Sequence, residues 1–297
     1  MSLFSLKTHT QTNRFEGWYV RFQDVTNDVN QAFILAFTNY VDDRHAFTQR
    51  FDGQKQKATY DRYERDAFAF VSDTVHIGPQ KLSLNQFFYQ DAALTIDIQL
   101  TQSSRPRKSA MSFLRFLPLE CFQEVIVLDG QARGTLTAGG ETREVEGKIY
   151  IEKTYGRRFP KQWFWLQAQQ FDDPSVRLSF AGGSIPTFKF RPFGFFCLVE
   201  VNGAMYRFAT YNRAKFHQVD LGDKVVFTLR KRSLQMRIEV SEHNPTALVG
   251  PNDYGQMNLE VFESLTAYVT VTLTRGDQTL IHSSSPWAGF EWMGQQL

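Results

Sequence analysis

Cysteine is scarce in this chain, which has only Cys121 and Cys197 among its 297 residues. Two cysteines are too few for a disulfide framework in a chain of this length, so the sequence favours a reducing compartment. The chain also lacks any run of about 18 apolar residues, the length that a membrane-spanning helix needs. Its N-terminal stretch has no apolar core of the kind found in signal peptides. We therefore expect a cytoplasmic protein without a transmembrane segment.

An excess of one charge sign is absent as well. The 33 basic and 31 acidic residues give a formal net charge of +2. So little net charge does not create the long-range positive field that draws proteins to nucleic acid. The basic run Arg105–Lys108 is short, and we interpret it as a solvated loop. The sequence therefore predicts no nucleic-acid partner.

The common catalytic signatures are also missing. There is no nucleophile elbow, phosphate-binding loop or dinucleotide-binding glycine pattern, and we interpret Gly139–Gly140 and Gly182–Gly183 as turns. Cys197 lies within the apolar stretch Phe195–Val199, which is typical of a buried strand. The histidines lack the spacing of metal ligands; they are His9, His45, His76, His217, His243 and His282. We therefore expect neither a metal nor a cofactor.

What the sequence does contain is alternation of apolar and polar residues, which is typical of strands with one face in water. The alternating segments are Leu94–Leu100, Leu234–Val240, Met257–Val261 and Val269–Leu273. Val225–Leu229 precedes the second of them and predicts a hairpin with it, while Leu84–Asp91 is the one segment that we expect to form a short helix. Many short strands together with 28 phenylalanines indicate antiparallel sheets that enclose an apolar volume.

The segment Lys148–Phe171 combines aromatic rings, cations and the single carboxylate of Glu152 more densely than any other part of the chain. Burying unpaired charge costs free energy, so these charges lie either on a solvated rim or in a ligand pocket.

Two aromatic stretches look like equivalent strand openings. They are Glu16–Tyr19 near the start of the chain and Trp163–Trp165 past its middle. Two lipocalin-like barrels in tandem would begin in this way. We therefore predict a boundary near Glu146, with domains at residues 1–146 and 147–297.

The densely aromatic segment resembles the tocopherol cyclase family. Tyr150-Ile-Glu-Lys-Thr-Tyr-Gly156, Phe159-Pro160 and Trp163-Phe-Trp-Leu-Gln167 follow the family pattern Tyr-x-Glu-Lys-Asn-Trp-Gly, Phe-Pro and Trp-x-Trp-x-Gln. The chain departs from that pattern at Thr154-Tyr155, where the family has Asn-Trp, and at Ala168-Gln169, where it has Cys-Asn. Further blocks look similar in the same order: Phe15–Tyr19, Phe116–Pro118, Gly203–Phe208, Tyr254–Leu259 and Pro286–Trp292.

Members of this family close a chroman ring by adding the phenolic oxygen of a prenylated hydroquinone across the nearest alkene of its tail. The family is distantly similar to carotenoid hydratases. The resemblance implies an all-β fold of two lipocalin-like (calycin-type) antiparallel β-barrels with very little helix. It also implies an intramolecular lyase, or cyclase, without a cofactor, whose partner is a hydrophobic prenylated quinol or isoprenoid. A substrate of this kind is compatible with transient contact between the protein and a membrane surface.

Protonation of an alkene needs an acid that stays neutral in an apolar pocket, and burial among rings raises the pKa of a carboxyl group. Glu152 and Glu16 lie beside aromatic residues that match the family, so we predict that one of them is the acid. The motif adds Lys153 and Tyr155 to the predicted catalytic residues. On a strand, Glu152 shares a face with Tyr150, opposite to Lys153.

Aromatic rings would stabilise the carbocation that protonation creates, by about 0.5–2 kcal/mol each. A glutamine amide suits a hydrogen bond to a quinol hydroxyl. The residues predicted to bind substrate are Trp18, Tyr19, Tyr150, Phe159, Trp163, Trp165, Gln167 and Trp292.

Two other interpretations stay open on this sequence. In one, the chain is a non-catalytic carrier of a hydrophobic prenyl or quinone-type ligand. In the other, it is a structural or interaction protein whose barrels are filled by side chains. Glu152 and Lys153 would then pair with neighbouring charges, and tryptophans such as Trp18 would plug the barrel floor.

Overall fold

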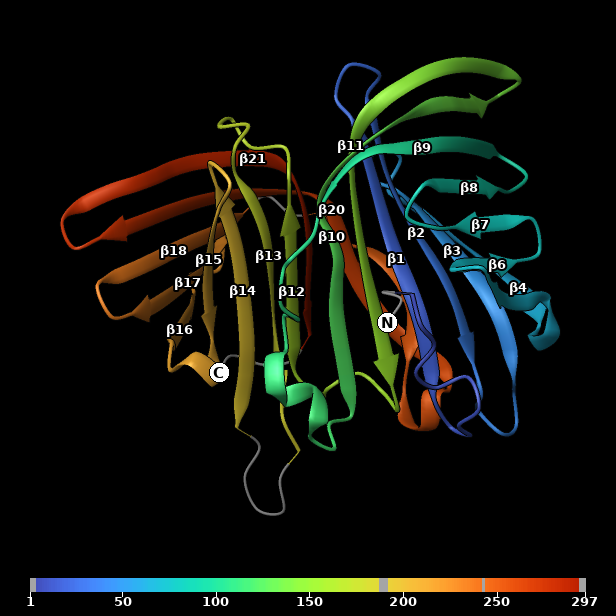
Figure 1. Cartoon of the computed structure of the whole chain (residues 1–297), viewed down its shortest axis with the longest axis horizontal. Coiled ribbons are helices and arrows are strands. Elements are labelled where there is room, and N and C mark those ends of the chain that lie inside the picture. The colour runs from blue at the N-terminus through green and yellow to red at the C-terminus, as the bar shows by residue number, and fades with distance from the viewer. Residues whose placement is uncertain (1–3, 187–191, 242–243, 294–297) are drawn as a thin grey trace. The chain divides into compact units, whose positions relative to one another are not determined.

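The structure is a computed structural model that describes residues 4–186, 192–241 and 244–293. Over these residues the chain forms antiparallel strands, drawn as arrows in Figure 1, and four short 3₁₀ helices. The helices are η1 (Arg65–Ala67), η2 (Ser112–Phe116), η3 (Thr210–Asn212) and η4 (Asp253–Gly255). None of the helices in the described ranges is long and apolar enough to cross a membrane.

The first eleven strands form one sheet, drawn from blue to green in Figure 1. They are β1 (Phe15–Asp24), β2 (Val29–Thr38), β3 (His45–Asp52), β4 (Lys57–Glu64), β5 (Phe68–Val71), β6 (Thr74–Ile77), β7 (Gln80–Leu82), β8 (Gln86–Gln90), β9 (Leu94–Ser104), β10 (Cys121–Ala138) and β11 (Glu141–Gly156). Their hydrogen-bonded order is β4-β3-β2-β1-β11-β10-β9-β8-β7-β6-β5. The first and last strands of this series, β1 and β11, are therefore neighbours in the middle of the sheet.

One face of this sheet forms an apolar core. On β1, Trp18, Val20 and Phe22 point to this face, and Ile149 and Ile151 of β11 join them. The spacing of two residues follows from the strand geometry, in which successive side chains point to opposite faces. The register pairs Val20 with Ile151 and Phe22 with Ile149, so the two strands bury a continuous apolar stripe.

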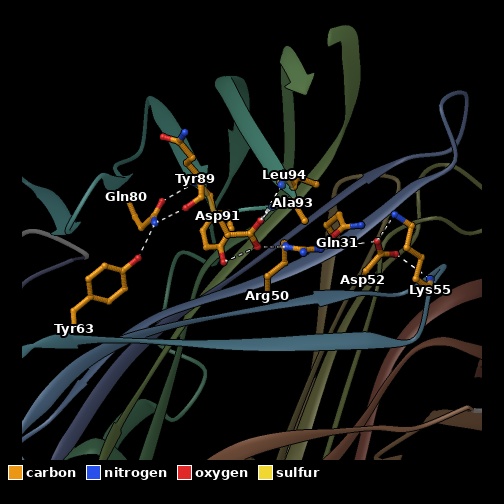
Figure 2. A network of polar contacts seen from close by, with 11 residues as sticks. Gln31, Arg50, Asp52, Lys55, Tyr63, Gln80, Tyr89, Asp91, Ala93 and Leu94 are labelled. Atoms are coloured by element: carbon orange, nitrogen blue, oxygen red, sulfur yellow. Dashed lines mark hydrogen bonds and ion pairs between the residues drawn. The ribbon is translucent and has the colours of Figure 1, made fainter. Parts of the chain in front are cut away.

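A network of partly buried polar contacts includes side chains of β3, β4 and β7, and Figure 2 shows these side chains. Arg50 of β3 donates through Nε to Oδ2 of Asp91 over 2.6 Å, and Gln80 of β7 donates to the hydroxyl of Tyr63 on β4 over 3.2 Å. Burial opposes ionisation of Asp91, but the hydrogen bonds from Arg50 and from the Ala93 N–H outweigh it and lower the pKa of Asp91. These contacts help to hold the sheet as a nearly closed barrel.

The remaining strands form a second antiparallel sheet, drawn from yellow to red in Figure 1. They are β12 (Trp163–Ala168), β13 (Arg177–Ser184), β14 (Phe193–Val201), β15 (Ala204–Ala209), β16 (Lys215–Asp220), β17 (Lys224–Lys231), β18 (Leu234–Ser241), β19 (Thr246–Pro251), β20 (Met257–Arg275) and β21 (Gln278–Met293). The order is β15-β14-β13-β12-β21-β20-β18-β17-β16, and β19 pairs with β20 outside this path.

Phenylalanine rings fill the core of the second sheet. Phe164, Phe180, Phe195, Phe216 and Phe227 pack with neighbouring ring centroids 4.5–6.5 Å apart. Rings at these separations gain both buried area and favourable edge or offset contacts. The high phenylalanine content of the chain is thus used in part to fill this barrel.

The chain divides into two compact units, each made of more than one segment. Unit 1 consists of Met1–Arg107, Cys121–Phe159 and Val249–Glu260, and unit 2 of Lys108–Glu120, Pro160–Leu248 and Val261–Leu297. Within unit 1, the amide of Gln49 exchanges two hydrogen bonds with the backbone of Val249, at 2.8 and 2.9 Å. A division into two domains near Glu146 stays a prediction.

The prediction of an all-β fold with two lipocalin-like antiparallel barrels is confirmed. The predicted hairpin is also confirmed, because β17 and β18 pair from Val225 with Val240 to Leu229 with Met236. The helix expected at Leu84–Asp91 is wrong: the segment contains β8, whose Phe87 and Tyr89 both face the core at the spacing of a strand.

The two pairs of glycines behave differently. Gly139 and Gly140, with φ of 61° and 85°, form the predicted turn between β10 and β11. The turn predicted at Gly182 and Gly183 is wrong, because both residues lie within β13. A Cβ at Gly182 would meet the ring of Phe164 at 2.7 Å, so glycine there provides room for the packed rings.

Candidate functional site

The neighbouring strands β1 and β11 place candidate residues on two opposite faces of the unit 1 sheet. Lys153 lies across from Trp18 and shares the core face with Ile151, while Glu152 lies across from Tyr19 on the other face. The sequence therefore predicted correctly that Glu152 and Lys153 face opposite ways. We describe the groups on the two faces as the core-face cluster and the outer-face cluster.

The core-face cluster is built on a buried ion pair. Nζ of Lys153 lies 2.5 Å from Oε1 of Glu16, and neither side chain is exposed to solvent. The same ammonium group donates to the backbone oxygen of Ser5 over 2.6 Å. A buried pair of this kind is retained only when the geometry and additional hydrogen bonds offset the cost of desolvation.

Backbone groups of the N-terminal segment complete the surroundings of Glu16. The Lys7 N–H lies 3.0 and 2.9 Å from the two carboxylate oxygens, and the Thr8 N–H donates to Oε2 over 2.7 Å. The Thr8 hydroxyl donates to Oε2 over 3.0 Å. With donors at both oxygens and an ammonium beside them, the arrangement fits a carboxylate anion.

Aromatic rings surround the other member of the pair. The ring centroids of Trp18 and Tyr155 lie 5.1 and 5.4 Å from Nζ of Lys153, within the range of cation–π attraction. Tyr155 stacks on Phe122 of β10 at 5.1 Å. Burial lowers the pKa of Lys153, and the negative charge of Glu16 opposes that effect. Among the described residues, the buried indole N–H of Trp18 has no hydrogen-bond acceptor.

The outer-face cluster is centred on Glu152. The hydroxyl of Tyr150 donates to Oε2 of Glu152 over 2.6 Å, and the amide of Gln123 donates to the same oxygen over 2.7 Å. Tyr19 packs edge-on against Tyr150 with centroids 6.5 Å apart. Beside them on β1, Arg21 is fully buried and donates to Oδ1 of Asn30 over 3.1 Å.

The structure thus separates the predicted residues of unit 1 into two groups. Sequence reasoning missed Gln123, which the β10 register places across from Thr154 and so on the same face as Glu152. No signal in the sequence gives this register, because β10 contains two irregularities, between Val125 and Val127 and between Val127 and Gly130. Phe159 packs edge-on against Phe15 of β1 at 5.7 Å.

The remaining predicted residues belong to unit 2. Trp163, Trp165 and Gln167 alternate with the core residues of β12 and so share the face opposite to that core. The indole N–H of Trp163 donates to Oε2 of Glu291 over 3.2 Å. Trp292 lies on the core side, where its ring contacts Phe227 at 6.5 Å.

Cys197 lies outside both clusters, in the second sheet. Cys197 lies in β14, where burial raises the pKa of its thiol above the ordinary value. Within the described residues, no group of three or more His, Cys, Asp or Glu side chains is arranged to hold a metal ion. The two clusters offer carboxyl, phenol, amide and ammonium groups, which suit proton transfer and charge stabilisation.

Comparison with solved structures identifies proteins of the same fold. A putative AttH protein from Nitrosomonas europaea is 15% identical with a TM-score of 0.54, over 95% of this chain and 92% of that one. Kievitone hydratase from Nectria haematococca is 11% identical with a TM-score of 0.60, over 98% and 92%. CghA, solved with Sch210972, is 8% identical with a TM-score of 0.56, over 94% and 88%.

The family model described as tocopherol cyclase-like matches residues 94–294. The match covers more than half of the chain and includes the segment Lys148–Phe171, whose motifs resemble those of the family. It also includes Glu152 and Lys153 of β11 and the strand β12, which carries Trp163 and Trp165. The chain belongs to the tocopherol cyclase-like family.

Proposed function

We propose that the chain is an enzyme that protonates an alkene of a prenylated hydroquinone or related isoprenoid and closes a ring without a cofactor. Membership of the tocopherol cyclase-like family supports this class of reaction. One protein of similar fold is a hydratase, and addition of water to an alkene also requires delivery of a proton.

Glu152 is the acid in this proposal. The observation that carries it is the convergence of Tyr150 and Gln123 on a single oxygen, Oε2. In a neutral carboxyl group, one oxygen only accepts hydrogen bonds while the other carries the proton. In the proposal Oε2 is the accepting oxygen, held by Tyr150 and Gln123, when the group carries its proton. Glu16, which has donors at both oxygens and a buried ammonium beside it, fits the ionised form instead.

The proposed reaction balances without a second reactant. The O–H bond of Glu152 breaks, its proton joins the less substituted alkene carbon, and the alkene electron pair forms the new C–H bond. The phenolic oxygen then donates an electron pair to the tertiary cation and closes the ring. The phenolic proton leaves to the carboxylate of Glu152, which restores the acid.

Other predicted residues have supporting roles in the proposal. Tyr150 holds the Glu152 carboxyl through its hydrogen bond, and Tyr19 packs against the ring of Tyr150. Trp163, Trp165 and Gln167 share one face of β12 in unit 2, and their part in substrate binding stays a prediction. Lys153 and Tyr155 are assigned to the core-face cluster, where they stabilise the negative charge of Glu16 and the packing around it.

Incubation with a prenyl hydroquinone in deuterated water tests the proposed function. Cyclisation places one solvent deuterium on the former alkene carbon, so mass spectrometry of the product is expected to show a singly deuterated chroman. A chain that yields no such product while the substrate quenches tryptophan fluorescence saturably is a carrier, and the proposal is then wrong for that substrate. Heat-denatured protein measures the background reaction.

A further inference from the structure

We propose that η2 and the residues beside it form a docking surface for an anionic lipid bilayer. The surface, called the η2 surface below, consists of Lys108, Phe113, Arg115, Phe116 and Leu117. All five residues belong to unit 2. The inference does not depend on the proposed reaction, because it is argued from the surface itself.

The η2 surface exposes large apolar side chains close together. Phe116 is 75% exposed, Phe113 is 55% exposed and Leu117 is 43% exposed. Most of the phenylalanines that the structure describes are buried, and Phe113 and Phe116 are the most exposed among them. Exposure of apolar area to water is unfavourable in proportion to that area, so a concentration of it on one short segment indicates a binding surface.

The segment is fixed to the barrel of unit 2. The guanidinium of Arg207 on β15 donates to the backbone oxygens of Ser109 and Lys108, over 2.8 and 3.0 Å. The hydroxyl of Tyr211 in η3 donates to the backbone oxygen of Ala110 over 2.9 Å. These bonds hold the chain that leads into η2, so its rings are presented to solvent from a fixed backbone.

Positive charge accompanies the exposed rings. Arg115 lies over the ring of Phe116 at 4.7 Å, and the exposed residues Arg105, Arg107 and Lys108 lead directly into the segment. From Arg105 to Glu120 the sequence holds four basic residues and one acidic residue, which is Glu120 itself. The surrounding field therefore favours an anionic partner.

Further cations lie beside the residues that anchor η2. Lys231, at the end of β17, donates through Nζ to the backbone oxygen of Arg207 over 2.9 Å. Burial lowers the pKa of Lys231, and the charges of Arg232 and Arg207 lower it further. Lys231, Arg232 and Arg207 therefore add positive charge beside the segment that leads into η2.

Exposed aromatic rings next to arginine and lysine match the chemistry of a bilayer surface. The rings and the leucine enter the boundary between headgroups and acyl chains, and the cations meet the lipid phosphates. The phosphates of a nucleic acid would pair with the cations, but Leu117 would stay exposed to water. An anionic bilayer is therefore the occupant that uses both features of the surface.

Sedimentation of the full chain with lipid vesicles tests this inference. We expect the bound fraction to rise about tenfold or more when about one third of the phosphatidylcholine is replaced by phosphatidylglycerol, and to fall in about 0.5 M NaCl. The double variant Phe113→Ser/Phe116→Ser and the charge variant Arg115→Glu are each expected to lower binding by about tenfold. These side chains are exposed, and the unfolding temperature of each variant verifies that it folds.

Phe262→Ser is the matched control, because Phe262 is also exposed, on β20 of the same unit. We expect this variant to bind vesicles as the unmodified chain does. Equal binding by Phe113→Ser/Phe116→Ser and the unmodified chain would overturn the inference. It would also be overturned by the absence of vesicle binding, or by rings that instead mediate self-association detected by light scattering without lipid.

Discussion

Two buried glutamates on opposite faces of one strand pair have very different surroundings. Glu16, on the core face of β1, lies 2.5 Å from the ammonium of Lys153 and accepts further hydrogen bonds from backbone groups. Glu152, on the outer face of β11, accepts from the hydroxyl of Tyr150 and the amide of Gln123. The first arrangement stabilises a negative charge, and the second holds the carboxyl group that we propose as the acid. Burial alone therefore does not identify a catalytic carboxyl group. Nearby charges and hydrogen bonds also influence whether a buried carboxyl group is neutral or ionised.

The largest effect on stability is expected when the core-face pair loses its cation. Lys153→Met leaves the carboxylate of Glu16 buried without its ammonium partner, which is expected to cost about 3–5 kcal/mol in the free energy of unfolding. Urea denaturation measures this loss. Lys148→Met is the matched control, because Lys148 forms a less buried pair with Asp129 at 3.2 Å, and we expect a loss of about 1 kcal/mol or less. Equal losses from both variants would contradict the account.

Removing both charges is expected to restore most of that stability. In Glu16→Gln/Lys153→Met, the amide oxygen of the new glutamine still accepts from the N–H groups of Lys7 and Thr8, and no unpaired charge remains. We expect the double variant to unfold within about 2 kcal/mol of the unmodified chain. A double variant as unstable as Lys153→Met would show that packing, not charge pairing, dominates the core-face cluster.

On the outer face, Tyr150 is expected to act as a positioning residue. Tyr150→Phe removes the hydroxyl that donates to Oε2 of Glu152, so we expect about a tenfold loss in the rate of cyclisation and a shift in the pH–rate profile. The control is Tyr268→Phe, which changes an exposed tyrosine of β20. A loss of stability in Tyr150→Phe with an unchanged pH profile would assign Tyr150 a purely structural role.

The smallest expected effect is a dependence of stability on pH that arises from Lys153. Burial lowers the pKa of Lys153 below its ordinary value of 10.5, against the attraction of Glu16. Between the lowered value and 10.5, the unfolded chain holds a proton that the folded chain has lost, so the free energy of unfolding rises with pH in that window. Below the window both states are protonated and the contribution is constant.

Denaturation at a series of alkaline pH values measures this dependence. The slope that belongs to Lys153 is at most about 1.4 kcal/mol per pH unit. We expect it to be present in the unmodified chain and absent from Lys153→Met. The same slope in both proteins would show that another group causes it.

Local patterns predicted much of the fold and of the candidate site. Alternation identified the strand at Leu94–Leu100, because Leu94, Ile96 and Ile98 all face the core of unit 1. It also placed Glu152 and Lys153 on opposite faces. The strand at Leu84–Asp91 was missed because a segment so short carries only two core residues, too few to reveal its period.

Features that depend on contacts between distant strands were not predicted. The pairing of Glu16 with Lys153 depends on the register of β1 with β11, where Trp18 lies across from Lys153. Gln123 reaches Glu152 through a β10 that has irregular register. A local pattern contains neither register, because each is set by the packing of the whole sheet.

The most direct test of the central claim compares the two glutamates in deuterated water. We expect Glu152→Gln to lower the rate of formation of deuterated chroman by about 10²–10⁴-fold with little change in the unfolding temperature. Glu16→Gln is expected to lower the unfolding temperature while its folded fraction keeps a rate within about tenfold of the unmodified chain. Glu141→Gln, at an exposed position of β11, is the control. A Glu152→Gln variant that retains the full rate while Glu16→Gln loses it would contradict the account.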